Sequence, residues 1–171
     1  MDQEVLSKDG FSEDYIPAEA LEPFEYENLS VGGVMIKRVK TRPEVKDVLV
    51  PFGVKKLGEG AFSGCRSLTK VFLPESLVSI GYEVFMECTR LTEITLPRGL
   101  VSIGWCAFRK CDSLKTIKVP LSLKQIDDAV FSRCLNLTDI YYEGTKKQWS
   151  QIKVGSENVF FTRARIHFNS Y

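Results

Sequence analysis

The residues that could carry out catalysis are few, and they lie far apart in the sequence. The chain has a single histidine, His167, which would have to serve as the base of any Ser-His-Asp or Cys-His system at neutral pH. It falls in an alternating segment, Ala164 to Phe168, which places it with Arg165 on the solvent side of a short strand. No pattern brings an activated serine or cysteine to this ring. The sequence therefore predicts a protein that is not an enzyme and has no catalytic residues.

Metal and phosphate sites have no better support in the sequence. Four of the five cysteines are spaced 23 residues apart, and Cys106 lies outside this series of Cys65, Cys88, Cys111 and Cys134. Zinc sites use closely spaced C-x-x-C pairs around a tetrahedral ion, and a straight row of thiols offers neither feature. The glycines at 32–33 and 58–60 lack the lysine and the strand–helix context of a phosphate loop. We therefore expect no metal and no cofactor, and we interpret Asp127-Asp128 as a turn.

The regular spacing of the cysteines leaves their oxidation state open. Equivalent residues on adjacent coils would lie roughly 5 Å apart, the spacing of neighbouring strands, which permits a disulfide bond. A row of identical inward positions is more typical of small, buried thiols. The pattern favours free thiols without excluding disulfides.

The cysteines belong to a 23-residue repeat that would position every other candidate residue. Seven kinds of position keep this spacing over four turns without insertion or deletion. The clearest series are Phe62, Phe85, Phe108 and Phe131, then Leu57, Ile80, Ile103 and Ile126, and also Pro51, Pro74, Pro97 and Pro120. A fixed period of about 20 to 29 residues is typical of leucine-rich solenoids. We therefore expect coils of equal length in which like residues stack over like.

Each repeat predicts one coil with a strand at its start. In Lys70 to Leu73, inward Val and Leu alternate with outward Lys and Phe, as in a strand with one buried face. Pro74 ends the strand because it lacks the N–H that would extend the ladder. The chain then turns inward through Ile80, and Gly81 follows where the backbone bends sharply or takes positive φ. Phe85 inserts from a tight helical turn.

The first 30 residues differ in charge from the rest of the chain. They hold nine acidic residues and one lysine, a net charge of −8, whereas the remainder carries +9. Their apolar residues are too many for a purely disordered tail. We expect a partly ordered acidic cap at residues 1–30, followed by the repeat array at 31–142, all within one structural domain.

The last coil leads into a C-terminal cap predicted for residues 143–171. Thr145 and Gln148 have the spacing of a capping box at a helix start. Trp149 and Ile152 would share one face of this helix, and Gly155 comes soon after the point where the helix should stop. A final strand at 164–168 would complete the cap.

The repeat resembles that of a known family. The phrase that carries the resemblance is Ile80-Gly81-x-x-Val84-Phe85-x-x-Cys88-x-x-Leu91-x-x-Ile94-x-Leu96-Pro97. It is similar to the BspA-like, treponemal-type leucine-rich repeat, and residues 142–155 resemble the terminal module of many such proteins. The resemblance implies a right-handed coil with a parallel sheet on one side, in a bacterial protein of the cell surface or secreted type that binds other proteins. It implies no catalytic residues.

Outward strand residues predict a protein-binding face made of two columns. The first column contains Asp47, Lys70, Glu93, Thr116 and Asp139, and the second contains Leu49, Phe72, Thr95, Lys118 and Tyr141. Opposite charges at neighbouring positions stabilise the stacking of the coils, so the first column can also be explained by a purely structural role. The second exposes Phe72 and Tyr141, and exposed aromatic residues are frequent interface anchors. Tyr82 and Trp105, in equivalent positions after the turn glycine, either add to the binding surface or lie flat over the edge of the coil.

Two other kinds of partner follow from the charge distribution. The acidic segment suggests a rival function, an intracellular inhibitor or decoy that engages a basic partner. Nucleic acid is a poor candidate, because the basic residues are not interleaved with aromatic residues that could stack on bases.

No segment approaches the roughly 20 apolar residues needed to cross a bilayer. The printed N-terminus has no signal peptide and predicts a cytoplasmic protein, whereas the resemblance implies the cell surface if a leader was removed.

Overall fold

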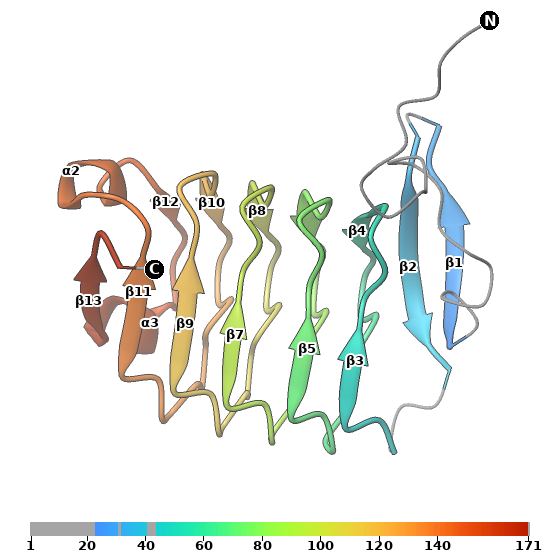
Figure 1. Cartoon of the computed structure of the whole chain (residues 1–171). Helices are drawn as coiled ribbons and strands as arrows, with labels where there is room; N and C mark the ends of the chain where they lie inside the picture. The colour runs from blue at the N-terminus through green and yellow to red at the C-terminus, as the bar shows by residue number, and fades with distance from the viewer. Residues whose placement is uncertain (1–22, 31, 41–43, 171) are drawn as a thin grey trace, which may run out of the picture.

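The chain folds into a solenoid whose coils have two β-ladders as walls (Figure 1). The structure is a computed structural model that describes residues 23–30, 32–40 and 44–170. Each regular coil contributes one strand to each wall, and strands of successive coils pair in parallel. The solenoid predicted from the 23-residue period is therefore confirmed.

The wall nearer the viewer in Figure 1 is here called the front wall. It consists of β3 (Asp47–Leu49), β5 (Lys70–Phe72), β7 (Glu93–Thr95), β9 (Thr116–Val119), β11 (Asp139–Tyr142) and β13 (Arg165–Phe168). Strands β7, β9, β11 and β13 form one parallel sheet, and β3 pairs with β5 in a second. No ladder joins β5 to β7 among these described strands.

The opposite wall, here called the rear wall, is a continuous seven-stranded sheet. Its strands are β1 (Phe24–Asn28), β2 (Val34–Val39), β4 (Val54–Leu57), β6 (Ser79–Ile80), β8 (Ser102–Ile103), β10 (Gln125–Ile126) and β12 (Lys153–Val154). The repeat predicts inward residues here but not a second ladder. A strand of two residues is too short to display an alternating pattern, so the rear wall forms through backbone pairing between coils rather than through a local sequence signal.

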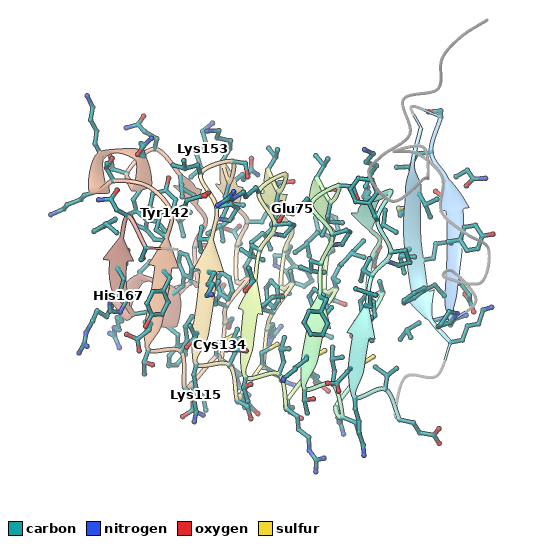
Figure 2. All side chains as sticks on the ribbon, viewed as in Figure 1. Glu75, Lys115, Cys134, Tyr142, Lys153 and His167 are labelled. Atoms are coloured by element: carbon teal, nitrogen blue, oxygen red, sulfur yellow. The ribbon has the colours of Figure 1, made fainter. Side chains whose placement is uncertain are left out.

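Side chains fill the space between the walls (Figure 2), and a file of phenylalanine rings runs through its centre. The four repeated rings are fully buried and stack with centroid distances of 5.3, 5.1 and 5.4 Å. Both ends of the file are closed by rings from outside the regular repeat. Phe24 meets Phe62 edge-on at 6.2 Å, and Phe161 stacks on Phe131 at 4.6 Å.

All five cysteines are buried, and none of them forms a disulfide bond. Those of the later coils donate their thiol hydrogens to the phenylalanine carbonyl of the preceding coil, for example Cys134 Sγ to Phe108 O at 3.0 Å. Equivalent bonds of 3.3 and 3.1 Å start from Cys88 and Cys111. Burial raises the pKa of the Cys134 thiol to about 12. The cysteine row therefore consists of neutral thiols that join one coil to the next.

The N-terminal end of the solenoid is covered by an antiparallel hairpin of β1 and β2, and β2 continues in parallel onto β4. The sequence predicts that the N-terminal cap ends at residue 30, but the hairpin continues past this residue to Val39. Residues 1–22 of the predicted acidic cap lie outside the described residues. Within the described part, Glu25 and Glu27 pair across the hairpin with Arg38 and Lys37, each at 2.7 Å.

The C-terminal end is covered by two short helices and a strand. The predicted capping box is confirmed at α2 (Lys146–Trp149), where Thr145 and Gln148 bond to each other's backbone N–H groups. Gly155 does not end this helix as the sequence predicts. It follows β12 instead, where a Cβ would lie 2.6 Å from the backbone of Asp127. A second helix, α3 (Val159–Arg163), has no counterpart in the sequence prediction, and it supplies Phe161.

The turn glycine of each repeat is required by space rather than by positive φ. A Cβ on Gly81 would lie 2.8 Å from the Leu57 carbonyl oxygen of the preceding coil. Positive φ occurs two residues later, at Glu83 (54°) and at the equivalent Gly60 (59°) of the first coil. The expected helical turn at Phe85 is a pair of turns, closed by the bonds Met86 N to Glu83 O and Cys88 N to Phe85 O.

These two positive-φ positions predict opposite effects of substitution. An L-residue in this conformation costs about 1–2 kcal/mol relative to glycine, and a Cβ on Gly60 would meet nothing closer than Ser63 Cβ, at 3.7 Å. Gly60→Ala is therefore expected to lower the free energy of unfolding by about 1 kcal/mol. Glu83→Gly should raise it by about 0.5–1 kcal/mol, because strain relief exceeds the added chain entropy. Urea denaturation measures both, and shifts in the same direction would contradict the strain account.

Candidate binding surfaces

The front wall carries the two predicted columns in the expected register. Glu93, Thr116 and Asp139 face one another across β7, β9 and β11. Thr95, Lys118 and Tyr141 form the neighbouring column, and the pairs Asp47–Lys70 and Leu49–Phe72 continue the columns on β3 and β5. The period of two within a strand and the period of 23 along the chain suffice to place these ten residues on one surface.

Strand β13 lengthens both columns by one residue that sequence reasoning did not include. Arg165 pairs with Asp139, and His167 pairs with Tyr141. The signal was present in the sequence, because Arg165-Ile166-His167-Phe168 has the same outward and inward alternation as Asp139 to Tyr142. The match was concealed because the segment between β11 and β13 is not the length of one repeat.

Exposure falls along the second column, from exposed side chains on β3, β5 and β7 to partly buried ones on β9, β11 and β13. Leu49 is 73% exposed and Phe72 is 58% exposed, as the alternation predicts. Tyr141, expected in the open, is only half-exposed because its ring stacks on His167 at a centroid distance of 4.5 Å. The accessible apolar anchor of this wall is therefore at β3 and β5.

His167 lies on β13 (Figure 2), and its side chain is only 32% exposed, so it is less solvated than the sequence predicts. Its Nε2 lies 2.8 Å from Asp139 Oδ1, and this bond lowers the pKa of the Asp139 carboxyl. The ring thus pairs with a carboxylate and an aromatic ring, and neither is the serine or cysteine that a hydrolytic triad requires. Among the described residues, no group of three or more His, Cys, Asp or Glu side chains could hold a metal ion.

A hollow of about 280 Å³ lies where the front ladder is interrupted between β5 and β7. Lys70 and Phe72 line it from β5, and Glu93 and Thr95 line it from β7. Four of the residues predicted to bind a partner therefore surround a single depression. Its rim carries Lys70 and two acidic side chains, Glu75 and Glu93, beside the exposed phenylalanine.

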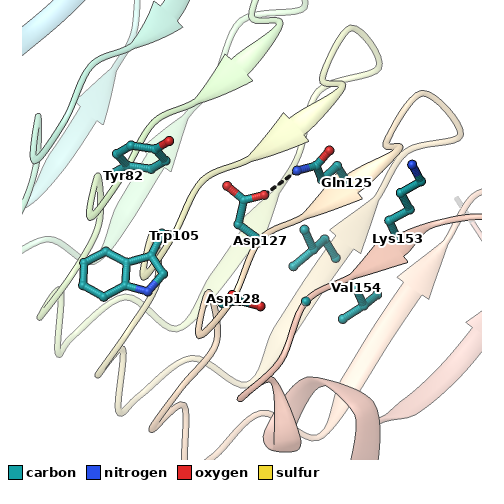
Figure 3. Close-up of a pocket in the computed structure, with 9 residues that line it drawn as sticks. Tyr82, Trp105, Gln125, Asp127, Asp128, Lys153 and Val154 are labelled. Carbon is teal, nitrogen blue, oxygen red and sulfur yellow. Dashed lines mark hydrogen bonds between the residues drawn. The ribbon is translucent and has the colours of Figure 1, made fainter.

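Tyr82 and Trp105 do not belong to this surface. They follow β6 and β8 on the rear wall, where they are 55% and 44% exposed. Both line a hollow of about 730 Å³ that also receives Gln125, Asp127 and Lys153 (Figure 3). The predicted binding residues thus divide into the ten of the two columns, which lie on the front wall, and Tyr82 and Trp105, which lie on the rear wall.

The basic residues of the body are partly neutralised by acidic neighbours. Glu25 and Glu27 engage Arg38 and Lys37 in the N-terminal hairpin. At the lower edge of the coils, Glu87 lies 2.7 Å from Lys110 and 2.8 Å from Arg66. Hydrogen bonds from these two cations lower the pKa of Glu87 to about 2. These pairs reduce the free positive charge that phosphate binding would need.

Equal coils, an aligned aromatic core and parallel ladders on the coil walls define a leucine-rich repeat solenoid. Residues 40–157 match the family described as BspA type leucine rich repeat region in six copies, and the chain belongs to this family. No curated protein matches the chain. Within the described part of the chain, no helix is long and apolar enough to cross a membrane.

Solved structures of bacterial leucine-rich repeat proteins share this fold. A leucine rich cell surface protein from Faecalibacterium prausnitzii A2-165 has 25% identity over 78% of this chain, with a TM-score of 0.64. A protein from Bacteroides capillosus ATCC 29799 has 29% identity over 71% of this chain and 95% of its own length, with a TM-score of 0.63. The T. pallidum leucine rich repeat protein is 23% identical over 84% of this chain and 81% of its own, with a TM-score of 0.57. The chain spans 41% of the length of the Faecalibacterium protein.

Proposed function

We propose that the protein is a non-enzymatic binding module whose front wall engages another protein. Leucine-rich repeat proteins are generally protein-interaction modules, and this chain belongs to such a family. The observation that carries the proposal is the hollow between β5 and β7, with the exposed Phe72 at its edge. The similarity to a cell surface protein supports an adhesion or host-interaction role at the cell surface.

The chemistry of this hollow suits a protein partner. Leu49 and Phe72 pair across β3 and β5 and together present an apolar patch. Lys70 and Glu93 flank the hollow with opposite charges, so a partner can be oriented as well as held. Interfaces typically combine a few such anchors with a polar rim, and the anchors supply most of the binding free energy.

The proposal predicts that the double substitution Leu49→Ala/Phe72→Ala weakens partner binding at least about tenfold, about 1.4 kcal/mol. The thermal transition should hardly move, because both side chains are exposed. Immobilised wild-type protein and variants would be incubated with a cell extract, and the retained proteins compared by quantitative mass spectrometry. Leu135→Ala is the matched control, since Leu135 is 62% exposed outside the front wall. Equal retention by all three proteins would show that this wall is not the interface.

A fourth bait in the same experiment tests the rival function, an inhibitor or decoy that uses the acidic segment. The deletion should remove residues 1–22 and stop before β1, because Phe24 is buried against Phe62. Under the front-wall proposal this bait retains the partner. Under the rival proposal it loses a basic partner that Leu49→Ala/Phe72→Ala still retains. Glu25 and Glu27 favour the first outcome because they already pair within the hairpin.

A further inference from the structure

The rear wall carries a shallow trough that runs across several coils. Two adjoining hollows, of about 730 and 470 Å³, share Tyr82, Gln125 and Asp127, so the depression is continuous. Turn glycines form part of its floor, including Gly81 and Gly104. The front wall contributes no residue to it. It is therefore a second surface, whose function is independent of the one proposed above.

We propose that this trough binds an extended, uncharged β-linked oligosaccharide, with about one sugar ring on each coil. The first reason is the spacing of the coils. Equivalent rings of successive coils are separated by 5.1 to 5.4 Å in the core. A pyranose unit in an extended β-1,4-linked chain advances by a similar length, so one sugar falls on each coil, with alternate sugars turned over.

An extended peptide does not share this spacing. A strand rises about 3.3 Å per residue, so side chains on one face recur about every 6.6 Å. A peptide lying along the trough would drift out of register with the coils after one or two steps. The repeat of the trough therefore selects a glycan over an extended peptide.

The second reason is the pair of aromatic rings in consecutive coils. A Cβ on Gly104 would lie 2.8 Å from Tyr82 Cδ1, so the Tyr82 ring lies along the next coil while remaining 55% exposed. Trp105 occupies the equivalent position one coil further on, and Figure 3 shows both rings beside the same hollow. The C–H groups on a pyranose face pack favourably on the electron-rich face of an aromatic ring. Two rings one coil apart provide platforms for two neighbouring sugars.

The third reason is a column of short polar side chains beside the rings. Ser79, Ser102 and Gln125 pair across β6, β8 and β10, and all three line the trough. Their hydroxyl and amide groups recur at the same step as the sugars and can bond to ring hydroxyls. Asp127 accepts from Gln125 Nε2 at 2.6 Å, which holds both side chains toward the hollow (Figure 3).

The trough has no excess of positive charge. Its basic residues are Lys56 and Lys153, and its acidic residues are Glu59, Asp127 and Asp128. A polyanion such as nucleic acid or a sulfated glycan would meet more negative than positive charge. A neutral glycan loses nothing by this arrangement, because its hydroxyls bond equally to carboxylates and ammonium groups.

The test uses the full chain and three defined probes. Cellohexaose and the hexamer of β-1,4-linked N-acetylglucosamine have the extended geometry, and maltohexaose, with α-1,4 links, does not. Isothermal titration calorimetry is expected to detect at least one β-linked probe and to give binding at least about tenfold weaker, about 1.4 kcal/mol, for maltohexaose. Fluorescence should change on binding through Trp105, because the other tryptophan, Trp149, packs against Tyr142 and Phe161 in the cap.

Substitutions in the trough test whether the oligosaccharide binds there. Tyr82→Ala and Trp105→Ala should each weaken binding at least about tenfold, and Trp105→Phe should lose less because it keeps a ring. Phe72→Ala on the front wall should bind normally. Circular dichroism confirms that each variant is folded, and Gln125→Ala provides a further trough variant. The proposal is overturned if neither β-linked probe binds, if maltohexaose binds equally well, or if binding survives both ring substitutions. It is also overturned if the rings prove necessary for retaining a protein while neither β-linked probe binds.

Discussion

Phe108→Ala is expected to lower the free energy of unfolding by about 3–5 kcal/mol, the range typical of a buried phenylalanine reduced to alanine. Phe108 is fully buried and lies in the middle of the ring file. It stacks on Phe85 at 5.1 Å and on Phe131 at 5.4 Å, so its removal opens a cavity against both neighbouring coils. Each lost stacking contact adds about 0.5–1.5 kcal/mol to the loss of apolar burial.

The coils on either side cannot easily close this cavity. Their backbones are fixed to one another through bonds such as Phe85 N to Ala107 O at 2.7 Å and Phe108 N to Val130 O at 2.9 Å. A site that cannot collapse keeps its full cavity cost, which places Phe108→Ala toward the upper end of the range.

Urea denaturation followed by far-ultraviolet circular dichroism measures this effect. Phe72→Ala makes the same chemical change at a 58% exposed position and should alter stability by no more than about 0.5 kcal/mol. A similar loss for the two variants would mean that the ring file is not the main stabilising feature of the solenoid.

The sequence predicts the interior of this fold better than its ends, for a physical reason. In a solenoid each coil packs against a copy of itself, so one repeated phrase specifies both sides of every internal contact. The contact between Phe85 and Phe108 can be predicted from their 23-residue spacing alone. Phe24 and Phe161 complete the same file from a hairpin and a short helix, and no period leads to them.

The binding surfaces show the same division. The order of Glu93, Thr116 and Asp139 across the front wall follows from two periods and needs no coordinates. The half-exposure of Tyr141 cannot be predicted in this way. It depends on stacking with His167, which lies in the cap after an irregular connection. The interruption between β5 and β7 has no sequence signal either, since the strand phrases on its two sides are both regular.

The polar column of the rear trough was hidden because its residues come from strands of two residues. Ser79 and Ser102 precede the repeated isoleucines, and their equivalence is visible in the sequence. Their orientation is not visible, because a two-residue strand has no alternation from which an outward side can be assigned. Only the pairing of β6, β8 and β10 places them beside Tyr82.

The closeness of the coils at the turn glycines leads to the second large effect. Gly81→Ala is expected to lower the free energy of unfolding by about 1–3 kcal/mol, the cost typical of overpacking. The new Cβ would lie 2.8 Å from the Leu57 carbonyl oxygen and 3.2 Å from the Gly58 carbonyl carbon. Both atoms belong to backbone, so no side chain can rotate away. The Gly81 N to Leu57 O bond, 2.8 Å long, would have to stretch.

Asp127 provides the natural control for this prediction, because it carries a Cβ at the equivalent position of the last coil. Its bond to the preceding coil, Asp127 N to Ile103 O, measures 3.0 Å, whereas the bonds from Gly81 and Gly104 measure 2.8 and 2.9 Å. The coils there already accommodate a side chain, so Asp127→Ala should cost less than about 0.5 kcal/mol. Urea denaturation of both variants decides the matter. If Gly81→Ala loses no more than Asp127→Ala, the coils yield at this contact, and close backbone approach is not the reason for glycine in the repeat.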